Sequence, residues 1–134
     1  MPDASGRPVQ ISDLAAIEAV VQTYFDGLYE GDVEKLGAAF HPCAHLYSAD
    51  GKGGVSDLPR EEWFAAVKTR PSGKVRGLAR ADRILLVDQS GPETAMVKVN
   101  CQLPPRYFTD YLVLNLTSEG WRIVSKVFRA DTRE

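Results

Sequence analysis

The chain has 134 residues, enough for one domain whose single core closes around a small cavity. Hydrophobic residues make up 44% and charged residues 25%, and 16 basic against 18 acidic side chains leave a net charge of −2. Because the two signs are interspersed, this balance argues against nucleic-acid binding. No segment approaches the roughly 20 apolar residues of a membrane-spanning helix, and the first ten residues lack the hydrophobic run of a secretory signal.

Residues 1–11 contain two prolines and a glycine, and we expect them to form a loose arm before a single domain over 12–134. Ser12 is a suitable N-cap for an amphipathic helix of about five turns. Its apolar positions recur at steps of three and four: Leu14, Ile17, Val20, Val21, Tyr24, Phe25, Leu28 and Tyr29. Gly31 is expected to end this helix in a left-handed conformation, and Asp32 to cap a short second helix that stops at His41-Pro42.

The middle of the chain predicts one short strand and one more helix. Residues 44–48 alternate like a strand, and the glycines within 50–54 indicate a flexible loop. Ser56 or Asp57 is expected to cap the third helix, with Pro59 in its first turn. The apolar face of that helix consists of Trp63, Phe64 and Val67.

After Gly73 the hydrophobic period changes to two. Strands are predicted near 78–88, 94–103, 107–116 and 121–129, with Gly- or Pro-containing connections between them. Helices followed by a meander of strands are typical of an α+β domain in which the helices cover one face of a mostly antiparallel sheet.

The last two strands carry the most unusual side chain. Phe108, Leu112, Leu114 and Leu116 share one strand face, and Asp110 lies among them. In the returning strand, strict alternation places Trp121 and Ile123 on one face and Lys126 on the other, where we expect a solvated or interface residue.

The cysteines and histidines give little indication of a metal site. Cys43 and Cys101 match no metal or redox spacing and are expected to be free thiols, as is typical of a cytoplasmic protein. His41 and His45 have the spacing of a helical metal pair, but Pro42 interrupts the helix and no third ligand is near. We therefore expect no metal ligands.

Several segments together resemble the nuclear-transport-factor-2-like (NTF2-like) superfamily. They are VVQTYFDGLYEGDVEKLGAAF at 20–40, the HP that follows, PREEWFAAV at 59–67, and FTDYLVLNL…GWRIVSKVF within 108–128. The SnoaL-like and "putative lumazine-binding" branch is the most similar. The resemblance implies a cone-shaped, cystatin-like fold, with three N-terminal helices packed in a strongly curved sheet and a pocket at its mouth. It also implies a homodimer formed through the outer sheet face.

Within that superfamily, the first helix is similar to that of ketosteroid isomerase. Tyr24 falls where that enzyme places the tyrosine of its oxyanion hole, and Asp110 falls near the aspartic acid that shares this role. The general base of that enzyme would align with Ser48, whose hydroxyl cannot abstract a carbon-bound proton near neutral pH. Asp50 could substitute only if its loop folded inward, so steroid-type isomerisation is not expected.

Structural roles for the same residues remain open. Tyr24 can be a pocket-wall tyrosine, and Asp110 can bond a loop or pair with a cation. His45 is a candidate general base if its strand register turns it inward. The candidate catalytic residues are thus Asp110, Tyr24 and His45. The candidate ligand-binding residues are Tyr24, Leu28, Ser48, Trp63, Phe64, Phe108 and Asp110.

Three hypotheses follow for function. The first is a small-molecule-binding domain with an apolar pocket for a ligand of apolar or mixed polarity. The second is an isomerase, dehydratase or cyclase that needs no cofactor and acts in the same pocket. The third is a non-catalytic dimeric structural or interaction module. Fold resemblance does not distinguish among them, because this superfamily includes both enzymes and binding proteins.

Overall fold

The computed structural model describes residues 11–133, so most of the predicted N-terminal arm lies outside the described residues. The first helix, α1 (Ile11–Glu30), begins at Ile11, so Ser12 lies inside the helix instead of capping it. Gly31 follows with a φ of 66°, which confirms the predicted left-handed helix end. None of the helices in the described part of the chain is long and apolar enough to cross a membrane.

The second helix, α2 (Val33–Ala39), is capped as expected: the Asp32 carboxylate accepts hydrogen bonds from the backbone N–H groups of Glu34 and Lys35. The third helix, α3 (Arg60–Thr69), begins directly after Pro59, without a side-chain cap. The prediction of Ser56 or Asp57 as its cap was therefore wrong, because both residues belong to an edge strand, β2 (Val55–Pro59). No burial pattern marks β2 in the sequence, since its residues are exposed or half-buried.

Six strands form one sheet in the order β2-β1-β6-β5-β4-β3. Apart from β2, they are β1 (Phe40–Ala49), β3 (Arg83–Ser90), β4 (Thr94–Leu103), β5 (Arg106–Thr117) and β6 (Gly120–Thr132). Neighbouring strands are antiparallel except for β1 and β6, which are parallel. β3 begins five residues later than predicted, because residues 78–82 form a loop.

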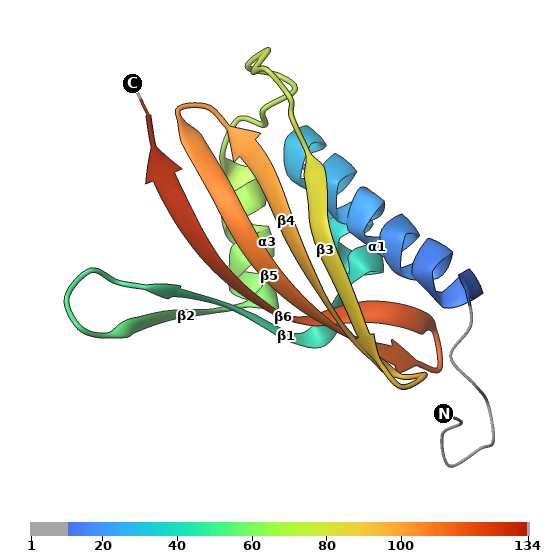
Figure 1. Cartoon of the computed structure of the whole chain (residues 1–134). Coiled ribbons are helices and arrows are strands. Elements are labelled where there is room, and N and C mark those ends of the chain that lie inside the picture. Colours follow the sequence, from blue (N-terminus) through green and yellow to red (C-terminus); the bar gives the residue numbers. More distant parts are fainter. Residues whose placement is uncertain (1–10, 134) are drawn as a thin grey trace.

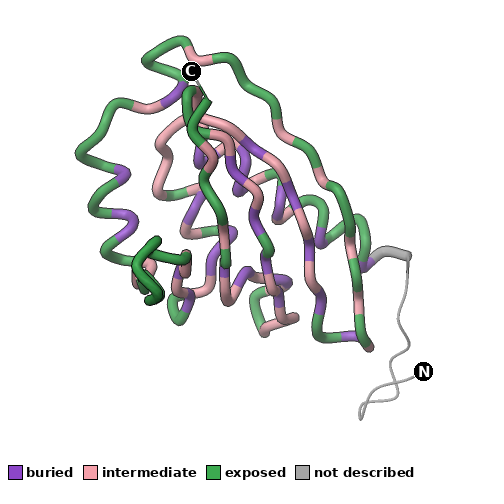
Figure 2. The backbone as a smooth tube through the Cα atoms, turned by 60° about the vertical axis from the view of Figure 1, so that its left-hand side comes forward, coloured by how far each residue is buried: buried purple, intermediate pink, exposed green. Residues whose placement is uncertain are grey.

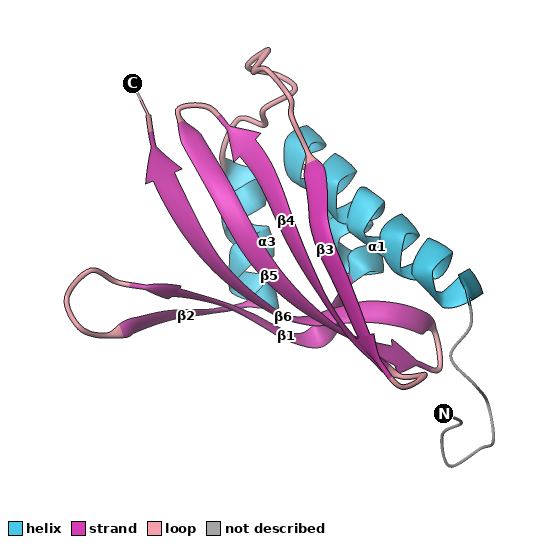
Figure 3. Cartoon of the chain, viewed as in Figure 1, coloured by secondary structure: helices cyan, strands magenta, loops and turns pink. Residues whose placement is uncertain are grey.

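The sheet curves around the helices (Figure 1). α1 and α3 both lie on one side of it, which is the layer arrangement predicted for an α+β domain (Figure 3). Buried residues concentrate between these two layers (Figure 2). Ile17, Val21 and Tyr24 of α1 meet inward-facing residues of the central strands, including Val97, Leu112 and Ile123. The hairpin formed by β1 and β2 extends beyond the rest of the sheet, so the loop at its tip does not cover the interior (Figure 1).

One irregularity in the pairing of β5 and β6 changes which side chains face the core. Leu112 pairs with Lys126 and Val113 with Ser125, but Leu114 pairs with Ile123. Val124 is therefore an extra residue, and such a bulge reverses the alternation beyond it. The prediction that Lys126 faces away from Trp121 and Ile123 was wrong: Lys126 is buried on their side, with 4% of its surface exposed.

Candidate functional site

The core contains a chain of hydrogen-bonded polar groups at its centre. Tyr24 and Asp110 are both fully buried, and the Tyr24 hydroxyl donates to Asp110 Oδ2 at 2.5 Å. Lys126 Nζ donates to the oxygen of that hydroxyl at 2.8 Å and lies 3.9 Å from Asp110 Oδ2. The expectation that Asp110 points inward toward Tyr24 is thus met, and the third member of the cluster is a lysine that the alternation had placed outside.

Four aromatic rings surround the Lys126 ammonium. Its Nζ lies 4.9 Å from the ring centroids of Trp63 and Phe128, 5.0 Å from that of Tyr24 and 6.0 Å from that of Phe108. The negative faces of aromatic rings attract a cation, and this attraction is strongest where water is excluded. Together with Asp110, these rings compensate a buried positive charge that would otherwise be costly.

The bonding pattern decides which group can meet a ligand. The single Tyr24 proton is committed to Asp110, so its oxygen can only accept, and the pKa of Tyr24 is raised by burial and then by the negative charge of Asp110. Lys126 uses one of its three donors on Tyr24 and has two left. Lys126 is therefore the group that can donate a hydrogen bond to a ligand, while Tyr24 and Asp110 hold it in position.

A cavity of about 160 Å³ lies directly in front of Lys126. Two arginines, Arg70 and Arg106, complete its lining. Its other walls are apolar: Leu28, Leu46, Leu58, Trp63, Phe108 and Phe128. A small apolar pocket with a few convergent polar groups is the usual form of a ligand site.

The structure brings together part of the predicted ligand-binding set. Leu28, Trp63 and Phe108 line the cavity, whereas Phe64 is buried in the core outside this lining. Ser48 lines an adjoining hollow that shares Arg106 and Phe128 with the cavity.

His45 lies apart from this cluster. It is half-exposed, its Nδ1 lies 2.6 Å from Asp57 Oδ1, and its ring stacks on Tyr47 at 5.9 Å. Its neighbour Leu46 takes the inward position and lines the cavity. The structure therefore does not bring His45 together with Tyr24 and Asp110.

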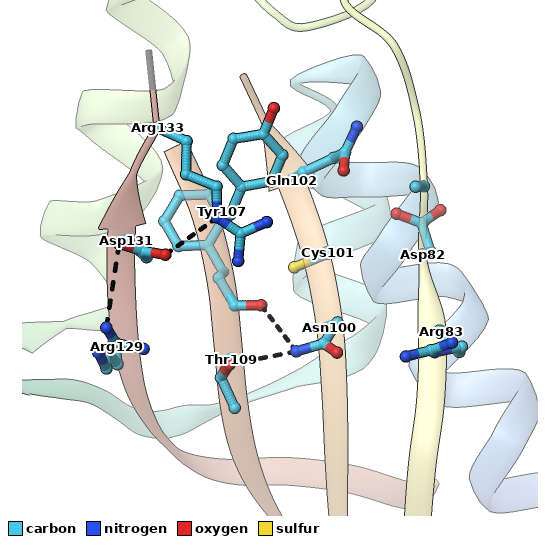
Figure 4. A pocket seen from close by; sticks show the side chains of 12 residues that line it. Asp82, Arg83, Asn100, Cys101, Gln102, Tyr107, Thr109, Arg129, Asp131 and Arg133 are labelled. Atoms are coloured by element: carbon cyan, nitrogen blue, oxygen red, sulfur yellow. Dashed lines mark hydrogen bonds and ion pairs between the residues drawn. The ribbon is translucent and has the colours of Figure 1, made fainter. Parts of the chain in front are cut away.

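A second hollow, of about 320 Å³, lies over the opposite side of the sheet from the helices (Figure 4). Several of its polar side chains bond to one another. Asn100 donates to Thr109 Oγ1 at 3.1 Å, while Asp131 accepts from Arg133 Nε at 3.0 Å. We regard the smaller cavity as the candidate site, because it alone of the two contains Lys126 and is walled by apolar side chains.

The two cysteines are free and differ sharply in environment: Cys43 is exposed, and Cys101 is buried next to the cluster. Burial raises the pKa of Cys101, the negative charge of Asp110 raises it further, and Lys126 opposes this only in part. We predict that Ellman's reagent will modify only Cys43 in the native protein and both cysteines in urea. Rapid modification of Cys101 in the native state would contradict this packing.

Solved structures with the same architecture define the class of the chain. An NTF2-like protein of unknown function from Shewanella baltica superimposes with a TM-score of 0.80 at 20% identity, covering 95% of this chain and 100% of that one. Another, from Silicibacter pomeroyi, gives a TM-score of 0.75 at 26% identity, covering 92% and 100%. The fold is therefore the NTF2-like, cystatin-like α+β fold expected from the sequence.

The family follows from the sequence match. Residues 12–129 match the family model described as "Putative lumazine-binding", and the chain belongs to this family. The chain is also 29% identical over 134 residues to a protein from Cladobotryum sp. named aldolase FrzH, covering 95% of this chain and 98% of that one.

Proposed function

We propose that this protein binds a small carbonyl compound in the cavity that Lys126 lines. The observation that carries the proposal is the free donor capacity of a buried ammonium at the end of an apolar cavity. A carbonyl oxygen can accept a hydrogen bond from Lys126 while the apolar part of the ligand packs on Trp63, Phe108 and Phe128. Tyr24 and Asp110 hold the ammonium in place before the ligand arrives, which lowers the cost of binding.

A matched pair of phenyl-substituted methyl esters tests this proposal. Methyl γ-benzoylbutyrate carries a ketone, and methyl δ-phenylvalerate has the same skeleton without it. Trp63 lines the cavity, so tryptophan fluorescence can report binding of both. We expect the ketone to bind at least about tenfold more tightly, since a hydrogen bond to a charged group contributes about 1.5–3 kcal/mol. Equal affinities, or no binding of either ester, would reject the proposal.

Catalysis of an aldol-type reaction is a second proposal for the same cavity, and the name of the Cladobotryum relative favours it. Aldol chemistry proceeds through an enolate. A solvent base removes the proton next to the carbonyl, and a prepositioned ammonium stabilises the negative charge left on the oxygen. Enolisation also exchanges the protons next to the carbonyl, so proton NMR in D₂O can detect it with methyl γ-benzoylbutyrate. Accelerated exchange would support catalysis, and binding without exchange would indicate a binding protein.

We also propose that the chain forms a homodimer through the outer face of its sheet. The strand register aligns Leu86, Lys98, Tyr111 and Val127 in one row across four strands. Leu86, Tyr111 and Val127 are 50%, 44% and 46% exposed, an unusual concentration of apolar surface that a second copy would cover.

Analytical ultracentrifugation tests this interface. We predict a dimer for the unmodified chain and a monomer for Tyr111→Glu, which places a charge at the centre of the row. Val55→Glu is the control, because Val55 is exposed in the β1–β2 hairpin, outside the row. A monomeric unmodified chain, or a Tyr111→Glu variant that stays dimeric, would contradict this interface.

A further inference from the structure

The entrance of the cavity is strongly basic. Arg70 and Arg106 both line the cavity of Lys126, and both also line an adjoining hollow that includes Arg76. Arg106 and Arg129 line a third hollow, which shares Arg106 and Phe128 with the cavity. None of these three linings includes an aspartate or a glutamate. This is notable in a chain whose net charge is −2.

The two arginines shared by the cavity and its neighbour have no carboxylate partner within residues 11–133, where ion pairs are otherwise frequent. Arg106 is held by a ring instead: its guanidinium carbon lies 4.9 Å from the centroid of Phe108, which is itself a cavity wall. The pKa of Arg70 is lowered by partial burial and by repulsion from Arg106. Two neighbouring positive charges without a counter-ion attract an anion and can bind it.

From this arrangement we infer that the ligand is an anion, a small carbonyl compound whose carboxylate binds Arg70 and Arg106 at the entrance while its carbonyl oxygen binds Lys126 inside. This inference rests on the proposed function for the inner end of the ligand. Guanidinium groups match a carboxylate with paired hydrogen bonds, and the apolar walls between the two ends suit a hydrocarbon segment. The ligand class is therefore a keto acid with an apolar body.

The basic entrance also affects how the ligand arrives. A cleft lined by charge of one sign, with low-dielectric walls, concentrates ions of the opposite sign at its mouth. Binding of an anionic ligand should therefore weaken as salt is added, whereas binding of its neutral ester should not change, because screening acts on exposed charges.

The test compares γ-benzoylbutyrate with its methyl ester, and the shorter β-benzoylpropionate with its own ester, by tryptophan fluorescence. In the unmodified protein we expect at least one acid to bind tenfold or more tightly than its ester, with a preference that falls at high salt. Arg70→Gln and Arg106→Gln should each reduce the acid-over-ester ratio severalfold, and the double variant should bring it close to one. Ester affinity should fall far less than acid affinity in each variant. Arg83→Gln, which removes the same charge from β3 outside the three linings, is the control.

The outcomes separate this inference from the proposed function. If both esters bind and neither acid gains an advantage, or if the double variant keeps the preference, the anion site is wrong and the carbonyl site stands. If an acid binds through the arginines but ketone and deoxy esters do not differ, the anion site stands and the role of Lys126 fails. Absence of binding by every acid and ester overturns both.

Discussion

Replacing Lys126 with methionine should remove most of the affinity for carbonyl ligands. The variant loses a charge-assisted hydrogen bond worth about 1.5–3 kcal/mol, so methyl γ-benzoylbutyrate should bind about 10- to 150-fold more weakly. Methyl δ-phenylvalerate, which lacks the ketone, should bind as before. If the protein catalyses enolisation, proton exchange should fall by about 10²–10³-fold, the usual cost of removing one oxyanion donor.

Two controls accompany this variant. Lys98→Met removes a lysine from the outer face of the sheet, where its Nζ lies 5.4 Å from the Tyr111 ring, and it should leave ligand affinity unchanged. Circular dichroism should show that Lys126→Met keeps its fold. A folded Lys126→Met protein with unchanged ketone affinity would contradict the assigned role of the ammonium.

Replacing Asp110 with asparagine should have the largest effect on stability. The substitution keeps the shape of the side chain and removes the only carboxylate near the buried Lys126 within residues 11–133. Removing one partner of a buried ion pair typically costs about 3–5 kcal/mol, because the other charge stays in the core without compensation. We expect urea denaturation to show a decrease of this size in the free energy of unfolding.

A double-mutant cycle separates this charge effect from lost packing. Asp110→Asn combined with Lys126→Met leaves no uncompensated charge, so the double variant should be more stable than the sum of the two single losses predicts. Asp131→Asn is the control, since Asp131 pairs with exposed arginines and should contribute about 1 kcal/mol or less. Additive losses in the cycle, or an Asp110→Asn protein as stable as the unmodified chain, would show that no buried pair exists.

Much of the fold was predictable because it depends on local patterns. Each of these patterns involves residues that are close together in the sequence. They are the three-and-four spacing of α1, the left-handed Gly31, the Asp32 cap, and the alternation of β4 and β5. The convergence of Tyr24 and Asp110 followed from a resemblance, and the structure places the two groups in contact. β2 was missed because an exposed edge strand has no buried face to impose alternation.

Lys126 was missed for a different reason. A single extra residue at Val124 reverses the alternation of β6, and nothing local to that strand marks the bulge, since Val124 is a good strand former. Its position depends on how β5 and β6 pair across the sheet. One signal was present: Phe128, two residues further on, joins Lys126 in the cavity wall, so an aromatic residue accompanied the lysine on the same face.

A crystal structure of the protein with γ-benzoylbutyrate bound would test the central claim most directly. We predict electron density inside the curved sheet, with the ketone oxygen at hydrogen-bond distance from Lys126 Nζ, about 2.7–3.2 Å, and Tyr24 still bonded to Asp110 behind it. A Lys126 side chain turned out toward solvent, or ligand density confined to the outer hollow of Figure 4, would contradict it.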